Sequence, residues 1–198
     1  MGYAVGILLS YLLGSIPNGL IFGKILWNVD LREHGSRNIG ATNAWRTLGK
    51  GPGILIFLLD FLKGYLSVWI GVTLIGTPLA EVLCGMASIL GHSCSLFLRF
   101  KGGKGVATGL GVIAMMMPWT TLVVFLLWLA IVWGTKYVSL GSCVAAACVP
   151  LAAWLFHNPA EYLVFGALAA ILIIVRHKAN ILRLMNGTES KIKAGHKG

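Results

Sequence analysis

The sequence predicts an all-α integral membrane protein, and its composition and its hydropathy pattern both support this fold class. Of its 198 residues, 57% are hydrophobic and only 11% are charged, whereas a soluble domain has about 25% charged residues. The mean hydropathy is +0.83. Uncharged stretches long enough to cross a bilayer recur along the chain. Lipid is therefore the expected solvent for much of the surface.

Five stretches have the length of a spanning helix, which needs about 20 apolar residues with a range of about 17–25. The second of them contains two charged residues, Asp60 and Lys63. The first has no basic segment before it, so we expect a retained helix rather than a cleaved signal peptide. The five stretches cover residues 3–22, 53–75, 82–98, 138–156 and 159–175.

The stretch 105–135 also lacks charge, but one helix of this length would extend about 46 Å, well beyond a hydrocarbon core of about 30 Å. Pro118 lies near its middle and offers a break, because proline removes a backbone donor and clashes with the preceding turn. The sequence therefore predicts two helices here, of which the first, 106–117, is short for a full crossing.

The distribution of lysine and arginine decides the number of spans. With seven spans and an extracytoplasmic N-terminus, the basic segments 24–50 and 99–104, Lys136 and the tail from Arg176 all face the cytoplasm. With six spans, Lys136 and the basic tail would lie outside. We therefore predict seven transmembrane helices in one polytopic domain, 1–198. The C-terminus is expected inside, with residues 194–198 as a disordered tail.

The net charge indicates which classes of molecule the protein binds. The formal net charge is +10, from 16 basic and 6 acidic residues, which favours anionic lipid headgroups or anionic substrates. No segment outside the bilayer is long enough to form a nucleic-acid reading surface. The four cysteines form no C-x-x-C pair and read as small buried residues. Neither a metal nor a cofactor is expected.

Three polar segments stand apart from ordinary membrane loops, and the first covers residues 30–50. It combines glycines with small donors and a cation, which are the groups that bind phosphate oxygens. A solvated positive-inside loop is the alternative interpretation. The candidate substrate-binding residues here are Ser36, Asn38, Thr42, Asn43 and Arg46.

The second segment covers residues 91–111 and surrounds Lys104 with Gly102, Gly103 and Gly105. Glycines allow backbone N–H groups to approach an anion, and the helix expected from Val106 adds positive charge at its N-terminus. The spacing is not that of a nucleotide-binding Walker loop, because Leu98 replaces its first glycine. Anion binding is predicted, with a simple glycine-rich turn as the alternative.

The third segment covers residues 176–192. His177 and Asn180 are three positions apart and share a face if the last helix continues, while Glu189 follows it. Ser142, at the start of the sixth span, is an ordinary helix cap unless it shares this face. His177 alone would be read as an interfacial helix cap.

Charged residues inside a span cost about 2.5–3.5 kcal/mol on insertion scales, so they need a partner or a role. Asp60 and Lys63, at i and i+3, are expected to pair structurally. We interpret His92, within the third span, as a hydrogen bond between helices.

These segments resemble the bacterial membrane-bound, acyl-phosphate-dependent glycerol-3-phosphate acyltransferases. The motifs that carry the resemblance run in family order over most of the chain, and Ser95 and Arg37 depart from the usual proline and glycine. The matching motifs are SIPNG (15–19), GSRNIGATN (35–43) with Arg46, LDFLKG (59–64), GH (91–92), FKGGKGVATG (100–109), KYVSLGS (136–142), RHKANILRL (176–184) and GTE (187–189).

The resemblance implies seven helices in a bacterial cytoplasmic (inner) membrane. It also implies a cytoplasm-facing site that transfers a fatty acyl group from acyl phosphate to the 1-hydroxyl of sn-glycerol 3-phosphate. The product would be lysophosphatidic acid, for phospholipid biosynthesis. It implies that six residues contact the phosphates and reacting groups, among them the catalytic set His177, Asn180 and Ser142; the others are Ser36, Arg46 and Lys104. It leaves open which cation holds which phosphate.

The proton acceptor also has two candidates. His177 is one, and an oxygen of the substrate phosphate is the other, which we favour because nearby cations disfavour a protonated histidine. No histidine has an aspartate five positions on, and no G-x-S-x-G elbow is present, so the more familiar acyltransferase dyad and serine nucleophile are not expected. The alternative function is a transporter of a phosphate-bearing solute, which would place its polar groups near the membrane midplane.

Overall fold

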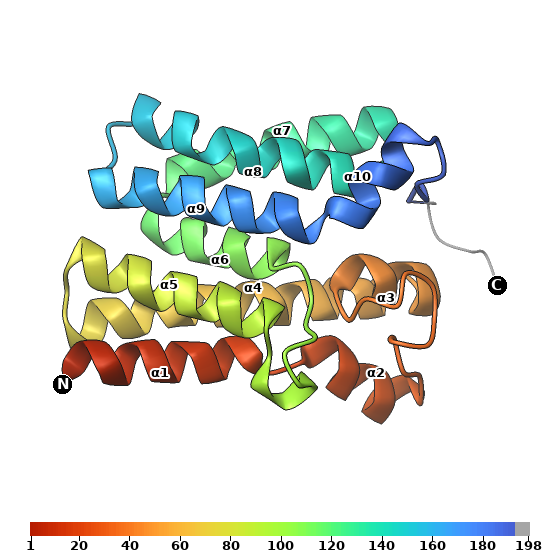
Figure 1. Ribbon diagram of the computed structural model, residues 1–198, viewed down its shortest axis with the longest axis horizontal. Helices are drawn as coiled ribbons and strands as arrows, with labels where there is room; N and C mark the ends of the chain where they lie inside the picture. The colour runs from red at the N-terminus through yellow and green to blue at the C-terminus, as the bar shows by residue number, and fades with distance from the viewer. Residues whose placement is uncertain (193–198) are drawn as a thin grey trace. The chain divides into compact units, whose positions relative to one another are not determined.

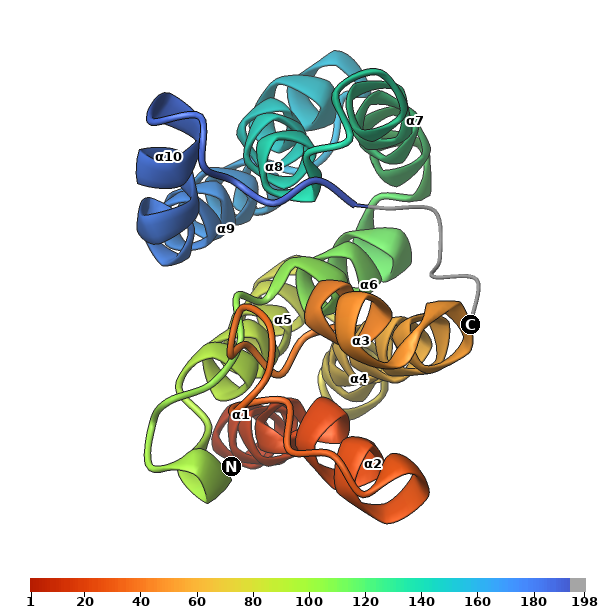
Figure 2. The ribbon, with the colours of Figure 1, turned by 90° about the vertical axis from the view of Figure 1, so that its right-hand side faces the viewer.

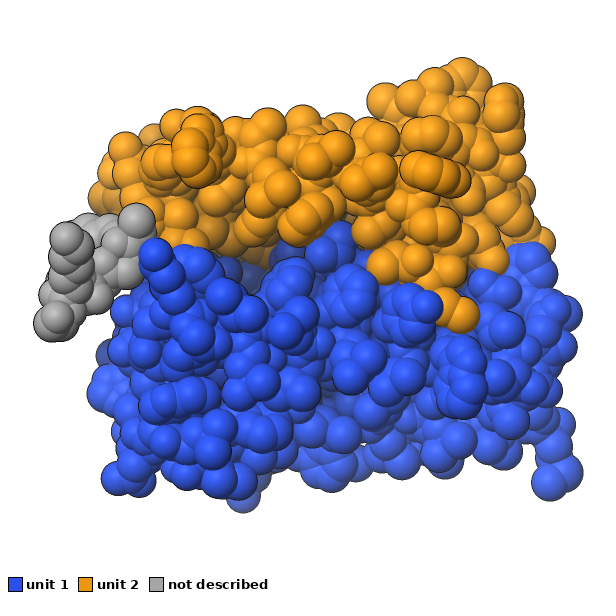
Figure 3. Space-filling model, turned by 180° about the vertical axis from the view of Figure 1, so that it is seen from behind, with its two compact units in different colours: residues 1–112, 193–198 blue, residues 113–192 orange. Residues whose placement is uncertain are grey.

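The computed structural model describes residues 1–192, which contain ten α-helices, one short 3-10 helix and no β-strand. These residues form two compact units, 1–112 and 113–192, which Figure 3 colours separately. Each unit is described by itself. The expected disordered tail, 194–198, lies outside the described residues, and the expectation of a single domain remains a prediction.

Unit 1 is built around three long helices that lie side by side: α1 (Gly2–Ser15), α4 (Lys50–Leu74) and α5 (Pro78–Ser93) (Figure 1). Small residues let their backbones approach closely, as is common in membrane helix pairs. A Cβ atom on Gly14 of α1 would overlap the backbone of Ser88 on α5, and one on Gly91 would overlap the Tyr11 carbonyl oxygen. The α1–α5 contact therefore depends on glycine.

Unit 1 also contains two shorter helices, α2 (Asn18–Trp27) and α3 (Ala41–Leu48), which lie together at the end of the unit where α1 ends (Figure 2). Leu31, Ala44 and Ile56 are fully buried and form a small core that packs α3 and the preceding loop onto α4. The polar segment 30–50 is therefore an ordered element with its own apolar contacts.

Unit 2 holds α7 (Pro118–Thr135), α8 (Val138–Leu155), α9 (Ala160–Arg176) and α10 (Lys178–Met185). α8 packs against both α7 and α9 (Figure 1). The contact with α9 is close at Gly166, where a Cβ atom would meet the Val149 side chain at 3.0 Å. α9 and α10 are bent by 62° at His177, so the last helix does not continue straight into the third polar segment.

The predicted break near Pro118 is confirmed. α6 (Val106–Met116) ends just before it, and α7 begins at the proline, which occupies a helix start where no backbone donor is needed. The 11 residues of α6 extend about 16 Å, less than a hydrocarbon core of about 30 Å.

Within residues 1–192, five helical stretches are long and apolar enough to cross a membrane, and six if α9 and α10 count as one bent span. Large apolar side chains point outward along them, for example Leu8 on α1 and Leu126 on α7, which are 57% and 54% exposed. Such surfaces suit lipid rather than water. The structure thus supports an all-α membrane protein, while α6 is too short to count by the same criterion.

Candidate active site

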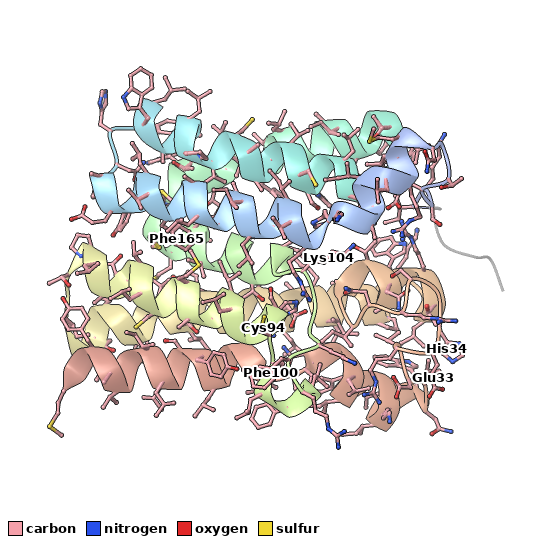
Figure 4. The ribbon with its side chains drawn as sticks, in the orientation of Figure 1. Glu33, His34, Cys94, Phe100, Lys104 and Phe165 are labelled. Atoms are coloured by element: carbon pink, nitrogen blue, oxygen red, sulfur yellow. The ribbon has the colours of Figure 1, made fainter. Side chains whose placement is uncertain are left out.

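The loop around Lys104 joins α5 to α6 and is anchored at both ends. Its start is fixed by two hydrogen bonds to α1: Ser95 Oγ donates to the Ser15 carbonyl at 2.6 Å, and Tyr11 Oη donates to the Cys94 carbonyl at 2.8 Å. Between the anchors lies the 3-10 helix η1 (Leu96–Leu98). Figure 4 shows Lys104 at the far end of this loop, beside the first turn of α6.

The glycines of this loop serve close packing against α5. The Gly102 amide donates to the Ser93 carbonyl at 3.1 Å, and the Gly103 amide donates to the His92 carbonyl at 3.0 Å. A Cβ atom on Gly103 would overlap the His92 ring. These two amides therefore donate to protein carbonyls. The sequence instead predicts that backbone N–H groups of these glycines approach an anion. Lys104 and the N-terminus of α6 remain as the groups suited to an anion.

Gly105 is required for its backbone conformation, whereas Gly102 and Gly103 are required for close packing. Its φ is +78°, in the left-handed region that glycine adopts without a Cβ penalty, and it directly precedes α6. Gly103 and Gly105 are buried, whereas Lys104 between them is half-buried. The sequence GGKG thus holds one long cation at the start of a helix by packing the residues on both sides of it.

Asn43 organises the loop of the first polar segment. Its Nδ2 donates to the carbonyls of Leu31, His34 and Asn38 at 3.0, 3.0 and 2.8 Å, and its Oδ1 accepts from the Ser36 amide at 2.8 Å. The side chain is buried and engaged with backbone on every side. Direct substrate binding by Asn43 stays a prediction, and its geometry favours positioning Ser36 and Asn38 instead.

The other candidates of this segment lie around that loop. Ser36 is exposed, and Asn38 Oδ1 accepts from the Gly40 amide at 2.9 Å, closing a tight turn before α3. Thr42 and Arg46 are half-buried on α3, four positions apart, so they share one face of this short helix. Glu33 and His34 lie farther out, at the tip of the α2–α3 connection (Figure 4).

A buried polar network lies within unit 1. Asp60 Oδ1 on α4 accepts from Lys63 Nζ at 3.0 Å, as the i, i+3 spacing predicts, and from Asn18 Nδ2 at 3.0 Å. Lys63 Nζ also donates to the Ile16 carbonyl at 3.0 Å. His92 Nδ1 on α5 lies 3.8 Å from Asp60 Oδ1, beyond hydrogen-bond distance, and the hydrogen bond of His92 between helices stays a prediction.

The Asp60–Lys63 pair joins the break between α1 and α2 to α4, and sequence reasoning missed Asn18 as its third member. Asn18 is inside the SIPNG motif, so its amide was visible, but nothing in the spacing placed it beside Asp60. All three side chains are at most 7% exposed. Because the carboxylate has two donors and the ammonium has a carbonyl as well, the pair is satisfied where water is scarce.

We expect Asp60→Asn to destabilise the purified protein strongly. The change leaves the buried Lys63 ammonium without a carboxylate, and removing one partner of a buried ion pair costs about 3–5 kcal/mol. The measurement is the thermal unfolding midpoint in detergent. The double variant Asp60→Asn/Lys63→Met, which removes both charges, should recover part of the loss, and an unchanged midpoint for the single variant would contradict the assignment.

His177 occupies the bend between α9 and α10 in unit 2. Its backbone amide donates to the carbonyls of Ile173 and Ile174, and its ring Nδ1 lies 2.8 Å from the Ile173 carbonyl oxygen. A carbonyl can only accept, so Nδ1 carries the proton in this arrangement and the neutral ring has its lone pair on Nε2. His177 is buried, and the bend fixes both its position and its tautomer.

Glu189 ties the residues after α10 back to α8 and α10. Its Oε1 accepts from Ser139 Oγ at 2.8 Å and from Asn180 Nδ2 at 2.7 Å, and its Oε2 accepts from Arg183 Nε at 2.7 Å. Burial alone would raise the pKa of Glu189, but the hydrogen bonds from Asn180, Arg183 and Ser139 outweigh it and lower the pKa. Glu189 is thus an ionised carboxylate with three donors.

The structure brings Asn180, Glu189 and Ser139 into direct contact, and Arg183 is a member that the sequence reasoning missed. The i, i+3 pair His177 and Asn180 lies across the bend and at the start of α10, with both side chains buried. Ser142, one turn beyond Ser139 on α8, donates to the Val138 carbonyl at 2.8 Å and accepts from Trp128 Nε1 at 3.3 Å. Ser142 therefore lies against α7 in this arrangement.

Comparison with known proteins assigns the chain to a family. A family model described as "Glycerol-3-phosphate acyltransferase" matches residues 4–187. The glycerol-3-phosphate acyltransferase of Syntrophomonas wolfei is 46% identical over 192 residues, 97% of this chain and 98% of the relative. Glycerol-3-phosphate acyltransferase 2 of Moorella thermoacetica is 44% identical, over 96% of this chain and 97% of its own.

Two solved structures also match over nearly the whole chain. Crystal structures of PlsY (YgiH), an integral membrane glycerol 3-phosphate acyltransferase, share its fold with TM-scores of 0.93 for the glycerol 3-phosphate form and 0.91 for the lysophosphatidic acid form. The identities are 42% and 41%, each over 98% of this chain, and over 96% and 97% of the respective solved chains. The resemblance drawn from the motifs is confirmed: this chain belongs to the glycerol-3-phosphate acyltransferase family.

Proposed function

We propose that this protein transfers a fatty acyl group from acyl phosphate to the 1-hydroxyl of sn-glycerol 3-phosphate and releases lysophosphatidic acid and inorganic phosphate. The observation that carries the proposal is the match over nearly the whole chain to a relative solved in glycerol 3-phosphate and lysophosphatidic acid forms. The motifs that resemble the acyl-phosphate-dependent enzymes support the choice of donor. The comparisons give no support to the transporter alternative.

The reaction needs few protein groups. The substrate hydroxyl oxygen attacks the acyl carbonyl carbon, an ester C–O bond forms, and the bond between the carbonyl and the phosphate breaks. Phosphate leaves readily, so positioning and charge stabilisation can supply much of the rate enhancement. The hydroxyl proton goes either to a substrate phosphate oxygen, which we favour, or to His177 Nε2.

The residues divide by chemistry. Lys104 at the start of α6 and Arg46 on α3 are cations for phosphate oxygens, and the exposed Ser36 hydroxyl is a further donor. In unit 2, His177, Asn180 and Ser142 are proposed to orient the reacting groups. Four further residues are proposed to contact no substrate and to support the positions of the residues that do: Asp60, Lys63, His92 and Glu189.

The test of the function uses the purified chain alone. In detergent, with acyl phosphate and glycerol 3-phosphate supplied, we expect lysophosphatidic acid and inorganic phosphate in equal amounts. Detergent leaves no sealed compartment, so a transporter would form no product. Failure to form lysophosphatidic acid from a folded preparation would overturn the proposal.

Lys104→Ala should lower kcat/KM by about 10- to 100-fold or more, because a charge-assisted hydrogen bond contributes about 1.5–3 kcal/mol. The matched control is Lys50→Ala, which removes an exposed lysine from the first residue of α4. Steady-state kinetics in detergent check both variants. Wild-type kinetics in a folded Lys104→Ala protein would remove Lys104 from the phosphate site.

We further propose seven membrane spans in the bacterial cytoplasmic membrane, with the site facing the cytoplasm. The one-sided distribution of lysine and arginine supports this orientation. The count requires the short α6 to serve as the fourth span.

Reporter fusions test this topology. Fusions after Thr77, in the α4–α5 connection, and after Gly198 are expected to report opposite sides of the membrane, with the first outside. The same side for both fusions would exclude an odd number of spans with the N-terminus outside.

A further inference from the structure

One cationic cleft of unit 1 has no part in the proposed reaction. It has a volume of about 430 Å³ and lies beside the 3-10 helix η1, at the outer part of the loop that ends in Lys104. Its lining joins three cations to two apolar side chains: Arg32, Arg99, Lys101, Phe97 and Leu98. A cleft with this mixture is suited to a ligand that is anionic at one end and apolar at the other.

The charge of the cleft is only partly balanced. The Asp30 carboxylate binds Arg32, with Arg32 Nη2 2.7 Å from Oδ2, but it is shared with Lys24 Nζ at 3.0 Å. Hydrogen bonds from the Arg32 guanidinium hold the pKa of Asp30 well below its usual range, so this carboxylate stays ionised. Within residues 1–192, the structure gives neither Arg99 nor Lys101 an acidic partner.

Apolar side chains in and after η1 are exposed. Phe97 and Phe100 are 58% and 61% exposed, and Leu96 is 50% exposed. The backbone is also strained, because Arg99 and Phe100 are consecutive non-glycine residues with φ of +49° and +63°. The backbone at Ser95, which accepts from the Phe100 amide at 2.8 Å, holds this turn in place. Phe100 lies at the η1 end of the loop, away from Lys104 (Figure 4).

We expect these side chains to lie toward one surface of the membrane. Ser95 is bonded to Ser15 at the end of α1, whose 14 residues extend about 21 Å. If α1 begins at one surface of a hydrocarbon core of about 30 Å, the loop lies in the last third of that core. Aromatic side chains favour this boundary, and long cations reach from it toward headgroups.

We propose that this cleft is a binding site for the phosphate headgroup of an anionic membrane phospholipid, held by Arg99, Lys101 and Arg32, with Phe97 and Phe100 against its acyl region. Charge complementarity selects the anionic headgroup, and the exposed aromatics select a ligand that is itself in the bilayer. A free phosphate would use the cations but gain nothing from Phe97. The site is separate from the substrate contacts proposed above, although the same loop carries Lys104.

Native mass spectrometry of the delipidated full chain in detergent tests the proposal without substrates. Phosphatidylglycerol and phosphatidylcholine of the same acyl composition are titrated separately. We expect one phosphatidylglycerol to bind in preference to phosphatidylcholine. In Arg99→Asn/Lys101→Gln its binding should weaken about tenfold or more, since each cation near an anionic headgroup layer contributes about 1 kcal/mol. Asparagine is chosen because it tolerates the left-handed backbone at position 99.

Two further variants make the result specific. Lys50→Gln/Lys136→Gln removes the same charge elsewhere and should bind phosphatidylglycerol like the wild type. Phe97→Ser/Phe100→Asn keeps the cations and should weaken lipid binding. Equal loss in both charge variants would reduce the effect to general surface charge and overturn the site, as would displacement of the lipid by equimolar inorganic phosphate. Unfolding midpoints equal to that of the wild type confirm that each variant is folded.

Discussion

Glu189→Ala is expected to lower kcat/KM by about 100-fold or more, although Glu189 touches no substrate in the proposed mechanism. The carboxylate accepts hydrogen bonds from Ser139, Asn180 and Arg183. Hydrogen bonds to a charged group contribute about 1.5–3 kcal/mol each, and a loss of about 2.7 kcal/mol corresponds to 100-fold in rate. Without Glu189, the Asn180 amide loses a charge-assisted hydrogen bond of 2.7 Å that helps to fix its orientation.

The controls separate positioning from general damage. Glu161→Ala removes an exposed glutamate from the first turn of α9 and should leave the kinetics unchanged. Glu189→Gln keeps the shape but presents a donor where the carboxylate accepted, so its loss should be smaller than that of alanine and fall mainly on kcat. Wild-type kinetics in Glu189→Ala would show that the cluster does not orient Asn180.

The same cluster predicts an acid limit to stability. The pKa of Glu189 is lowered in the folded protein from its ordinary value of 4.5, so its contribution is complete above that value. It is lost as the pH falls through the lower folded-state pKa. The acid loss of stability should therefore be reduced in Glu189→Gln relative to the wild type, because glutamine does not titrate.

Much of the fold followed from the sequence because lipid exposure imposes long uncharged runs. The break at Pro118 was predictable, since a helix of residues 105–135 would exceed the bilayer and proline cannot continue a hydrogen-bonded turn. The ordered character of segment 30–50 was not. Its order depends on Leu31 and Ala44 packing on Ile56, a contact between distant positions that no local pattern reveals.

Some features of the candidate site were likewise predictable from local sequence, whereas others depend on tertiary contacts. Lys104 and its glycines were recognisable because a lysine among glycines before a helix has a local meaning. The Gly102 amide donates to the Ser93 carbonyl and the Gly103 amide to the His92 carbonyl because of how the loop folds back on α5, which spacing does not specify. Asn18 at Asp60 is likewise a tertiary contact, made possible by the break between α1 and α2.

The contact between Arg183 and Glu189 depends on a turn that sequence spacing does not reveal. It is six positions before Glu189, a spacing that would place the two on different faces of a continuous helix. The helix instead ends at Met185, and Gly187, with φ of +68°, reverses the chain so that Glu189 meets Arg183 Nε at 2.7 Å. The glycine in the GTE motif was the available indication of such a turn.

A second prediction concerns the group that accepts the hydroxyl proton. His177→Asn is expected to retain much more activity than it would if His177 were the general base. In the structure Nδ1 of His177 donates to the Ile173 carbonyl. The asparagine amide can occupy the position of Nδ1 and keep that bond, but it has no group corresponding to Nε2. If a substrate phosphate oxygen accepts the proton, positioning survives and the loss stays below about 100-fold; loss of a general base costs about 10²–10⁴-fold.

His177→Gln is the complementary variant, because its amide can reach the position of Nε2 while the bond to Ile173 is lost. Both variants are followed as kcat against pH under saturating substrates, with His157→Asn, an exposed histidine in the α8–α9 connection, as the control. Retention in His177→Asn of any wild-type limb near pH 6.5 assigns that limb to the substrate phosphate, whose second ionisation lies nearby. Disappearance of the limb together with a loss of about 10³-fold or more would instead make His177 Nε2 the base, with the Ile173 carbonyl holding its tautomer.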